Sequence, residues 1–191
     1  LTLLIFSIMC TGILIVAAAG NNNVMEYPAA YEEVVSVGSV NCFGERSLGS
    51  ATGEELELMA PGEQILTTGA FGGVLVSSGT SIATAHVTGI ASLLWQIDLS
   101  CPSDFIRKLM DFSANKYGDS NEYGYGLIDV ECAMKNYYKF KKIYERTGSL
   151  DNNIELARKS GVLIDNNSEV IVFSDVDYVT GSWLKGEHKS M

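Results

Sequence analysis

Residues 77–89 read SSGTSIATAHVTG and place a serine at the start of an apolar helix. Gly79 permits a tight turn, and apolar side chains recur at helical spacing from Ile82 to Trp95. Ser81 is therefore predicted in the first helical turn, where unpaired amides and the positive helix end favour a nearby oxyanion. A serine mounted in this way is suited to act as a nucleophile. The same residues also suit an ordinary N-cap, so both interpretations stay open at this point.

A second segment, residues 13–21, is typical of a buried strand that ends at an amide side chain. Its sequence ILIVAAAGN begins with β-branched residues and then shrinks to small ones. The small Ala19 and Gly20 leave room for a ligand beside the strand end, and the amide of Asn21 can donate a hydrogen bond to an oxyanion. A plain turn is the alternative, because the run GNNN is also rich in turn-forming residues.

His86 follows Ser81 closely, but helix geometry excludes it as the general base for that serine. Five residues turn a helix by about 500 degrees, so the two side chains point about 140 degrees apart. The other histidine, His188, lies beside the C-terminus, where exposed residues without a catalytic role are typical. Neither histidine is assigned to catalysis.

Several blocks, taken in order, resemble the subtilisin-like serine proteases. The blocks are residues 17–21, 27–31, 34–40, 58–62, 65–68, 79–89 and 123–129. The resemblance covers residues 1–134 and implies the C-terminal half of a subtilisin-like peptidase domain. It implies a three-layer α/β fold with a mostly parallel sheet, and it leaves residues 135–191 as a small α/β extension of unknown role.

The resemblance implies a serine endopeptidase that forms an acyl-enzyme on Ser81. The side chain of Asn21 and the backbone amide of Ser81 would hold the oxyanion, and His86 matches a structural histidine. The expected substrate-binding residues are Ala19, Gly20, Glu26 and Gly79. Peptides or proteins are the expected substrates.

Glu26 matches a position near the bottom of the pocket for the side chain that precedes the cleaved bond. A carboxylate there would favour Lys or Arg in the substrate. The loop between Asn21 and Tyr27 is short, so a Glu26 side chain that points to solvent is the open alternative.

The family order along the chain is Asp, His, Ser, so the remaining triad residues are expected upstream of Leu1. The chain is then a fragment that we expect to be inactive by itself. The alternative from another class is a non-catalytic relative that binds peptides, or an inactive remnant. The resemblance favours a secreted or cell-envelope location over a cytoplasmic one, and the sequence leaves the compartment undetermined.

Residues 1–20 carry no charge and have the length of a membrane span. A helix over 1–10 followed by a strand over 13–19 is the favoured interpretation, because such pairs build α/β sheets. No membrane span is therefore expected.

Charge is distributed unevenly along the chain, whose net charge is −10. Residues 1–134 hold 15 acidic and 4 basic side chains, whereas residues 135–191 hold 8 acidic and 9 basic ones. An acidic body without a basic patch argues against nucleic acid as a partner. It suits the steering of cationic peptides, or simply solubility.

Cofactor signals are weak. No cofactor is expected, and no metal-ligand motif is found, although carbonyls at Ala29, Tyr31 and Val34 match a weak structural cation site, such as one for calcium, in some relatives. The four cysteines lack metal-type spacing and are interpreted as buried thiols, with disulfides as the alternative. They are Cys10, Cys42, Cys101 and Cys132.

The extension contains no recognisable motif. Residues 135–146 predict a basic amphipathic helix that continues the last helix of the domain, and residues 154–159 predict a short one. Residues 170–173 and 177–183 predict short strands or a hairpin. We expect the extension to pack on the main domain, because about 57 residues form only a marginal core alone.

Overall fold

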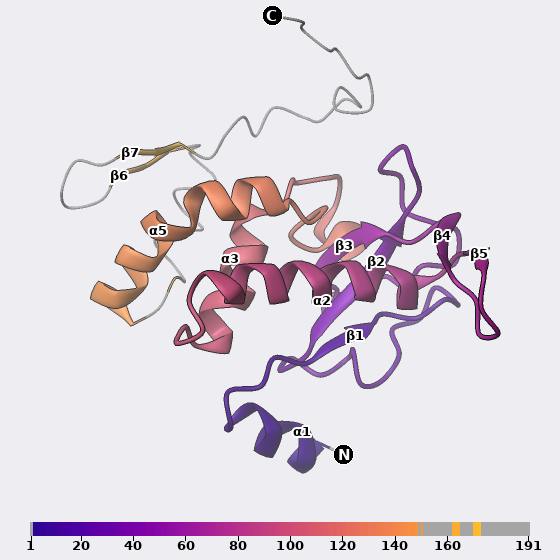
Figure 1. Ribbon diagram of the computed structural model, residues 1–191, viewed down its shortest axis with the longest axis horizontal. Helices are drawn as coiled ribbons and strands as arrows, with labels where there is room; N and C mark the ends of the chain where they lie inside the picture. Colours follow the sequence, from indigo (N-terminus) through magenta and orange to yellow (C-terminus); the bar gives the residue numbers. More distant parts are fainter. Residues whose placement is uncertain (1, 149, 151–161, 165–169, 173–191) are drawn as a thin grey trace, which may run out of the picture.

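The structure is a computed structural model that describes residues 2–148, 150, 162–164 and 170–172 (Figure 1). In chain order the elements are α1 (Thr2–Met9), β1 (Val16–Ala18), β2 (Val35–Val40), β3 (Leu58–Pro61), β4 (Ile65–Thr68), β5 (Val74–Ser77), α2 (Thr80–Ile97), α3 (Ser103–Ser113), α4 (Ser120–Tyr123), α5 (Val130–Thr147), β6 (Val162–Ile164) and β7 (Val170–Val172). The helix expected over residues 1–10 and the strand expected over 13–19 are confirmed as α1 and β1, and β1 is shorter than expected.

Strands β1, β2 and β3 form a parallel sheet with the order β1-β2-β3. Val16 lies opposite Val35, and Val37 lies opposite Leu58. Every residue of β2 is buried, as expected for a central strand that is covered on both faces. The predicted α/β fold with a mostly parallel sheet is confirmed.

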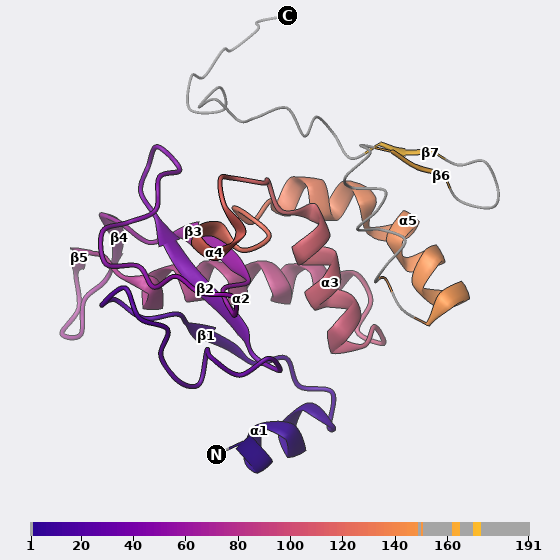
Figure 2. The ribbon, with the colours of Figure 1, turned by 180° about the vertical axis from the view of Figure 1, so that it is seen from behind.

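Helix α2 covers one face of this sheet (Figures 1 and 2). Its buried residues recur at helical spacing and form one apolar stripe. They are Thr80, Ala83, Val87, Ala91 and Leu94. The apolar members of the stripe share a core cluster with Val35, Val37 and Leu58 of the sheet.

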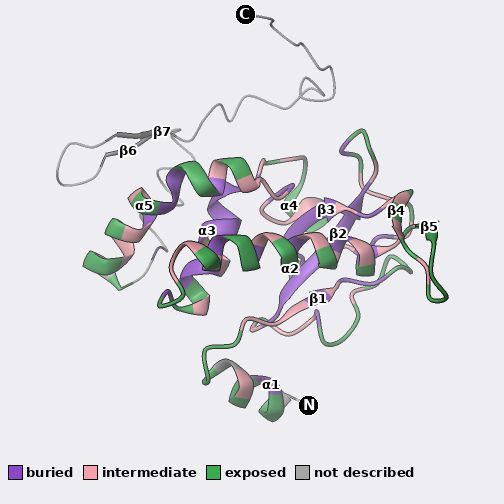
Figure 3. Ribbon diagram, viewed as in Figure 1, coloured by how far each residue is buried: buried purple, intermediate pink, exposed green. Residues whose placement is uncertain are grey.

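Helices α3 and α5 pack together and extend this core at the far end of α2 (Figure 2). The ring of Phe105 in α3 meets the ring of Tyr137 in α5 edge to face, with 5.4 Å between their centroids. The other face of the sheet is covered by loops, where Met59 and Val40 pack against Leu127. The buried residues therefore concentrate in the sheet and in the helix faces turned toward it (Figure 3).

Helix α5 runs without interruption across the predicted domain boundary at Met134. The Asp129 carboxylate caps its N-terminus by accepting a 2.8 Å hydrogen bond from the backbone N–H of Cys132. Tyr137 and Phe140 of α5 are fully buried in the main core. The helix predicted over residues 135–146 is confirmed, and the division of the chain at residue 134 stays a prediction.

Strands β6 and β7 pair antiparallel, with Leu163 opposite Ile171. The strand predicted near residues 170–173 is confirmed as β7. The helix predicted over residues 154–159 and the strand predicted over residues 177–183 lie outside the described residues.

The apolar N-terminal stretch divides into an eight-residue helix and a strand. Within the described part of the chain, no helix is long and apolar enough to cross a membrane.

The four cysteines form no disulfide in the described structure, and only Cys101 is buried. The prediction of buried thiols is wrong for Cys10 and Cys42, which are exposed. Cys10 directly follows α1, and Cys42 lies in the turn after β2, so their apolar sequence neighbours do not cover them.

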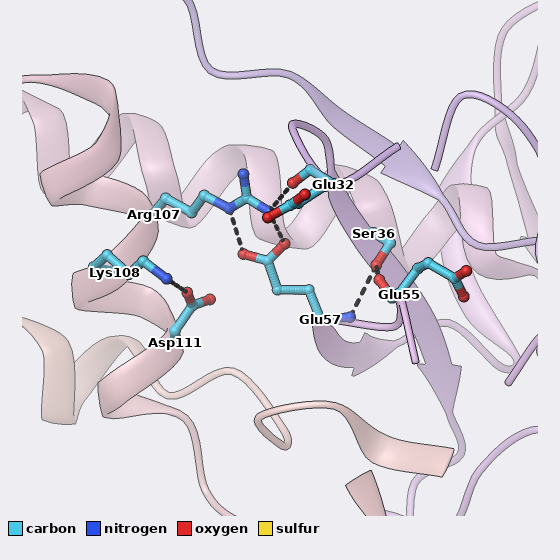
Figure 4. A network of polar contacts seen from close by, with 7 residues as sticks. All are labelled: Glu32, Ser36, Glu55, Glu57, Arg107, Lys108 and Asp111. Carbon is cyan, nitrogen blue, oxygen red and sulfur yellow. Dashed lines mark hydrogen bonds and ion pairs between the residues drawn. The ribbon is translucent and has the colours of Figure 1, made fainter. Parts of the chain in front are cut away.

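A buried ionic cluster joins α3 to the start of β3 (Figure 4). Arg107 forms a bidentate ion pair with Glu57, with N–O distances of 2.7 and 2.6 Å. Asp111, one turn further along α3, is 1% exposed, and Lys108 Nζ lies 3.9 Å from its Oδ2. Burial first, and then the negative charge of Glu57, raise the pKa of Asp111 well above its usual value.

This raised pKa predicts a stability that falls as the pH rises. Above the ordinary Asp pKa the unfolded chain loses the proton and the folded chain keeps it, so unfolding becomes more favourable by up to about 1.4 kcal/mol per pH unit. The fall ends at the raised pKa of the folded state. Asp111→Asn cannot ionise, so its free energy of unfolding should lack this fall.

Urea unfolding of both proteins from about pH 4 to about pH 8 measures the difference. Glu54→Gln removes one carboxylate at an exposed position and is the matched control. If the wild-type and Asp111→Asn curves run parallel over this range, Asp111 does not hold its proton in the folded state.

Candidate active site

The end of β1 and the start of α2 bring the two predicted catalytic side chains to one place. Gly79 is the N-cap of α2 and has a φ of +148°, which disfavours any other residue. A Cβ at Gly79 would lie 3.6 Å from Nδ2 of Asn21 and 3.6 Å from Oγ of Ser81. Asn21 and Ser81 therefore both lie next to Gly79.

Thr80 fixes the orientation of the Asn21 side chain. The Oδ1 atom of Asn21 accepts hydrogen bonds from the backbone N–H of Thr80 at 2.9 Å and from its hydroxyl at 3.1 Å. Because the oxygen end of the amide accepts both bonds, this network assigns the NH2 group to the opposite end. No residue in the described part of the chain accepts from that NH2 group, so it can donate to a ligand.

Ser81 lies in the first turn of α2, as predicted, and its side chain is exposed. The neighbouring amides are already used: Thr80 donates to Asn21, and the amides of Ile82 and Ala83 donate to the Gly79 carbonyl. The backbone N–H of Ser81 has no acceptor among the described residues. An open amide at a helix N-terminus is suited to bind an oxyanion.

The N-cap interpretation of Ser81 is wrong, because the cap of α2 is Gly79, which makes no side-chain hydrogen bond. The plain-turn interpretation of Asn21 is also incomplete. Its side chain contacts the first helical residue across 59 positions of sequence. Both residues therefore take part in a tertiary arrangement that local sequence rules do not describe.

Thr80 is the residue that sequence reasoning missed. It is fully buried, and its hydroxyl also accepts a 3.3 Å hydrogen bond from the backbone N–H of Gly20. The sequence does show a threonine directly before the candidate nucleophile Ser81. The residues that it contacts, however, could be identified only once β1 and α2 were placed side by side.

His86 is engaged with its own helix. Its Nδ1 atom lies 3.1 Å from the carbonyl oxygen of Ile82, one turn earlier. This contact agrees with the structural role expected for His86. His188 lies outside the described residues.

The predicted substrate-binding residues lie around the end of β1. Ala19 is fully buried, donates to the carbonyl of Val37 and accepts a 2.9 Å bond from the N–H of Glu26. The side chain of Glu26 folds over Gly20, where an added Cβ would lie 3.0 Å from Cγ of Glu26. Glu26 is exposed, so it lies near the strand end without being enclosed.

The contacts of Thr80 generate a prediction for Thr80→Val, which keeps the shape and removes the hydroxyl. The Gly20 amide loses an acceptor and Asn21 loses a donor, so the free energy of unfolding should fall by about 1–3 kcal/mol. Thr88→Val is the matched control, because its exposed hydroxyl bonds only to Thr84 within the same helix. Urea unfolding measures both changes, and equal losses in the two variants would contradict the role assigned to Thr80.

The chain is similar to known proteins of one family. The model of the subtilase family matches residues 3–126. Subtilisin DY of Bacillus licheniformis is 39% identical over 131 residues, which is 65% of this chain and 48% of that protein. Subtilisin E of Bacillus subtilis (strain 168) is 37% identical over 131 residues, which is 65% of this chain and 34% of that protein.

A solved structure has the same fold. The prenylagaramide maturation protease PagA matches with a TM-score of 0.62 and 26% identity, covering 66% of this chain and 51% of that one. The chain spans about half, or less, of the length of these curated relatives. The family match covers more than half of the chain, and the chain belongs to the subtilase family.

Proposed function

We propose that this chain provides the nucleophile and the oxyanion hole of a serine endopeptidase. The observation that supports this proposal is that two hydrogen-bond donors without an acceptor among the described residues lie beside the exposed hydroxyl of Ser81. The donors are the NH2 group of Asn21 and the backbone N–H of Ser81. Membership of the subtilase family supports the same reaction.

In the proposed reaction, Oγ of Ser81 attacks the carbonyl carbon of a peptide bond and gives its proton to a general base. The carbonyl oxygen becomes an oxyanion, which the two donors stabilise. The C–N bond then breaks, the amine leaves with the proton, and an acyl group remains on Ser81. Water then releases the acyl group by the reverse sequence of proton transfers.

The general base is expected from a histidine outside the described residues. His86 is the only histidine among them, and its ring contacts the carbonyl of its own helix. The same observation favours a second candidate function. A relative without a working triad would use the Asn21 donor and the β1 end to bind peptides without cleaving them.

Expression from the complete coding sequence separates the two functions. We expect a fluorophosphonate probe to label Ser81 and casein to be cleaved, and Ser81→Ala should abolish both. Asn21→Ala should lower kcat by about 10² to 10³ with little change in KM, a magnitude already measured for such a donor in a subtilisin. Ser92→Ala, an exposed serine on the same helix, is the matched control.

The peptide-binding candidate gives a different result. Peptides would bind with an affinity that Ser81→Ala leaves unchanged, and neither labelling nor turnover would be seen. That outcome would refute the proposed hydrolysis.

Glu26 is proposed as a determinant of substrate preference. Its side chain lies over Gly20, next to the proposed oxyanion donor Asn21. Glu26→Gln should lower kcat/KM for substrates with Lys or Arg before the cleaved bond by about tenfold, and leave leucine substrates unchanged. Glu54→Gln, which is exposed, serves as the control. An unchanged preference in Glu26→Gln would show that the carboxylate points to solvent during catalysis.

Peptides or proteins are the proposed partners, and a secreted or cell-envelope location is proposed from the family alone. The excess of acidic side chains among residues 1–134 supports the approach of cationic peptides, because a negative electrostatic potential raises their concentration near the protein surface.

A further inference from the structure

One arginine connects three segments of the chain around the loop that follows Glu26 (Figure 4). Nη2 of Arg107 lies 2.8 Å from the carbonyl oxygen of Glu32 and 2.6 Å from Oε2 of Glu57. Nε of the same guanidinium donates to Oε1 of Glu57 at 2.7 Å. The loop, the start of β3 and helix α3 therefore meet at a single side chain.

The hydrogen bond from Arg107 to the Glu32 carbonyl connects the loop to a residue outside it. Within the described residues, the other backbone hydrogen bonds of the loop are local turns: Ala30 donates to Glu26, Tyr31 to Pro28 and Val34 to Tyr31. The apolar contacts of Ala29 and Val34 anchor the base of the loop beside Ala17. Among the described residues, Arg107 is the one donor to the carbonyl of Glu32.

A carbonyl and a carboxylate that converge in this way are the oxygen ligands that calcium prefers. Here a nitrogen of Arg107 lies between them instead. The side chain of Glu57 is 7% exposed and that of Arg107 is 19% exposed, so water screens the pair weakly. Burial opposes the charge on Arg107, but the hydrogen bonds and charge of Glu57 outweigh it and raise the pKa of Arg107.

The residues therefore do not fit a calcium ion at this place. Such an ion would need an oxygen of Glu57 and the carbonyl of Glu32, and both are already bound by the guanidinium. The described residues also contain no cluster of three or more acidic, histidine or cysteine side chains suited to a metal.

We propose that Arg107 holds the loop of residues 27–34 in place, with its guanidinium lying between the Glu32 carbonyl and the Glu57 carboxylate. The guanidinium neutralises Glu57 and binds the Glu32 carbonyl, and its rigid fork allows both contacts at once. The loop begins directly after Glu26. This inference concerns the order of the loop and does not depend on the proposed hydrolysis.

Hydrogen exchange of the full chain tests the proposal. In Arg107→Met the Tyr31 and Val34 amides should exchange at least about tenfold faster relative to amides of α2 in the same molecule. This ratio removes the effect of a general loss of stability. Lys116→Met removes one positive charge at an exposed position and should leave the ratio unchanged.

Arg107→Lys keeps the charge and loses the fork, so it should give a smaller increase in the same ratio, and it is the variant to use if Arg107→Met does not fold. The proposal is overturned if the loop amides of both Arg107 variants exchange as in the wild type.

Discussion

The hydrogen bonds between Thr80 and Asn21 are the interaction on which the candidate site depends. They join Asn21, three residues beyond the end of β1, to the first residue of a helix 59 positions later. One carboxamide oxygen accepts two donors, so the amide cannot rotate without leaving a buried threonine hydroxyl unpaired. The same contact that stabilises the junction also directs the NH2 group of Asn21 away from it.

This junction exists because the core places β1 and α2 side by side. The apolar stripe of α2 packs on the sheet, and parallel strands bring their carboxyl ends to one edge. The helix then begins where β1 ends, so its open amide and the exposed Ser81 lie beside Asn21. The arrangement of the candidate site is thus a consequence of packing between a helix and a sheet, with Gly79 providing the space and the backbone angle.

A second tertiary constraint is the ion pair of Arg107 and Glu57, which also contacts the loop that follows Glu26. Buried charge is unfavourable unless it is paired and hydrogen-bonded, and Arg107 meets both conditions for Glu57. Asp111 adds a further carboxyl group to the same buried place, where burial and then the charge of Glu57 raise its pKa well above the usual value. Arg107, one of the four basic residues among residues 1–134, thus connects α3, the start of β3 and the loop.

Local sequence pattern predicted the helix over residues 82–95, the strand over residues 13–19 and the position of Ser81 in the first helical turn, because these depend on contacts a few residues apart. Helix geometry was also enough to exclude His86 as the base for Ser81. The exposure of Cys10 and Cys42 was not predictable, since it depends on what covers each turn.

The sequence by itself determined α1, β1, α2 and α5 and the chemical type of the candidate residues, because propensity and periodicity act locally. The tertiary structure decided that Asn21 faces Thr80, that the Ser81 amide stays open and that Arg107 bridges Glu32 and Glu57. The contacts of Asn21 with Thr80 and of Arg107 with Glu57 and Glu32 join residues 50 or more positions apart, and no local pattern specifies which distant groups will meet when a helix packs on a sheet.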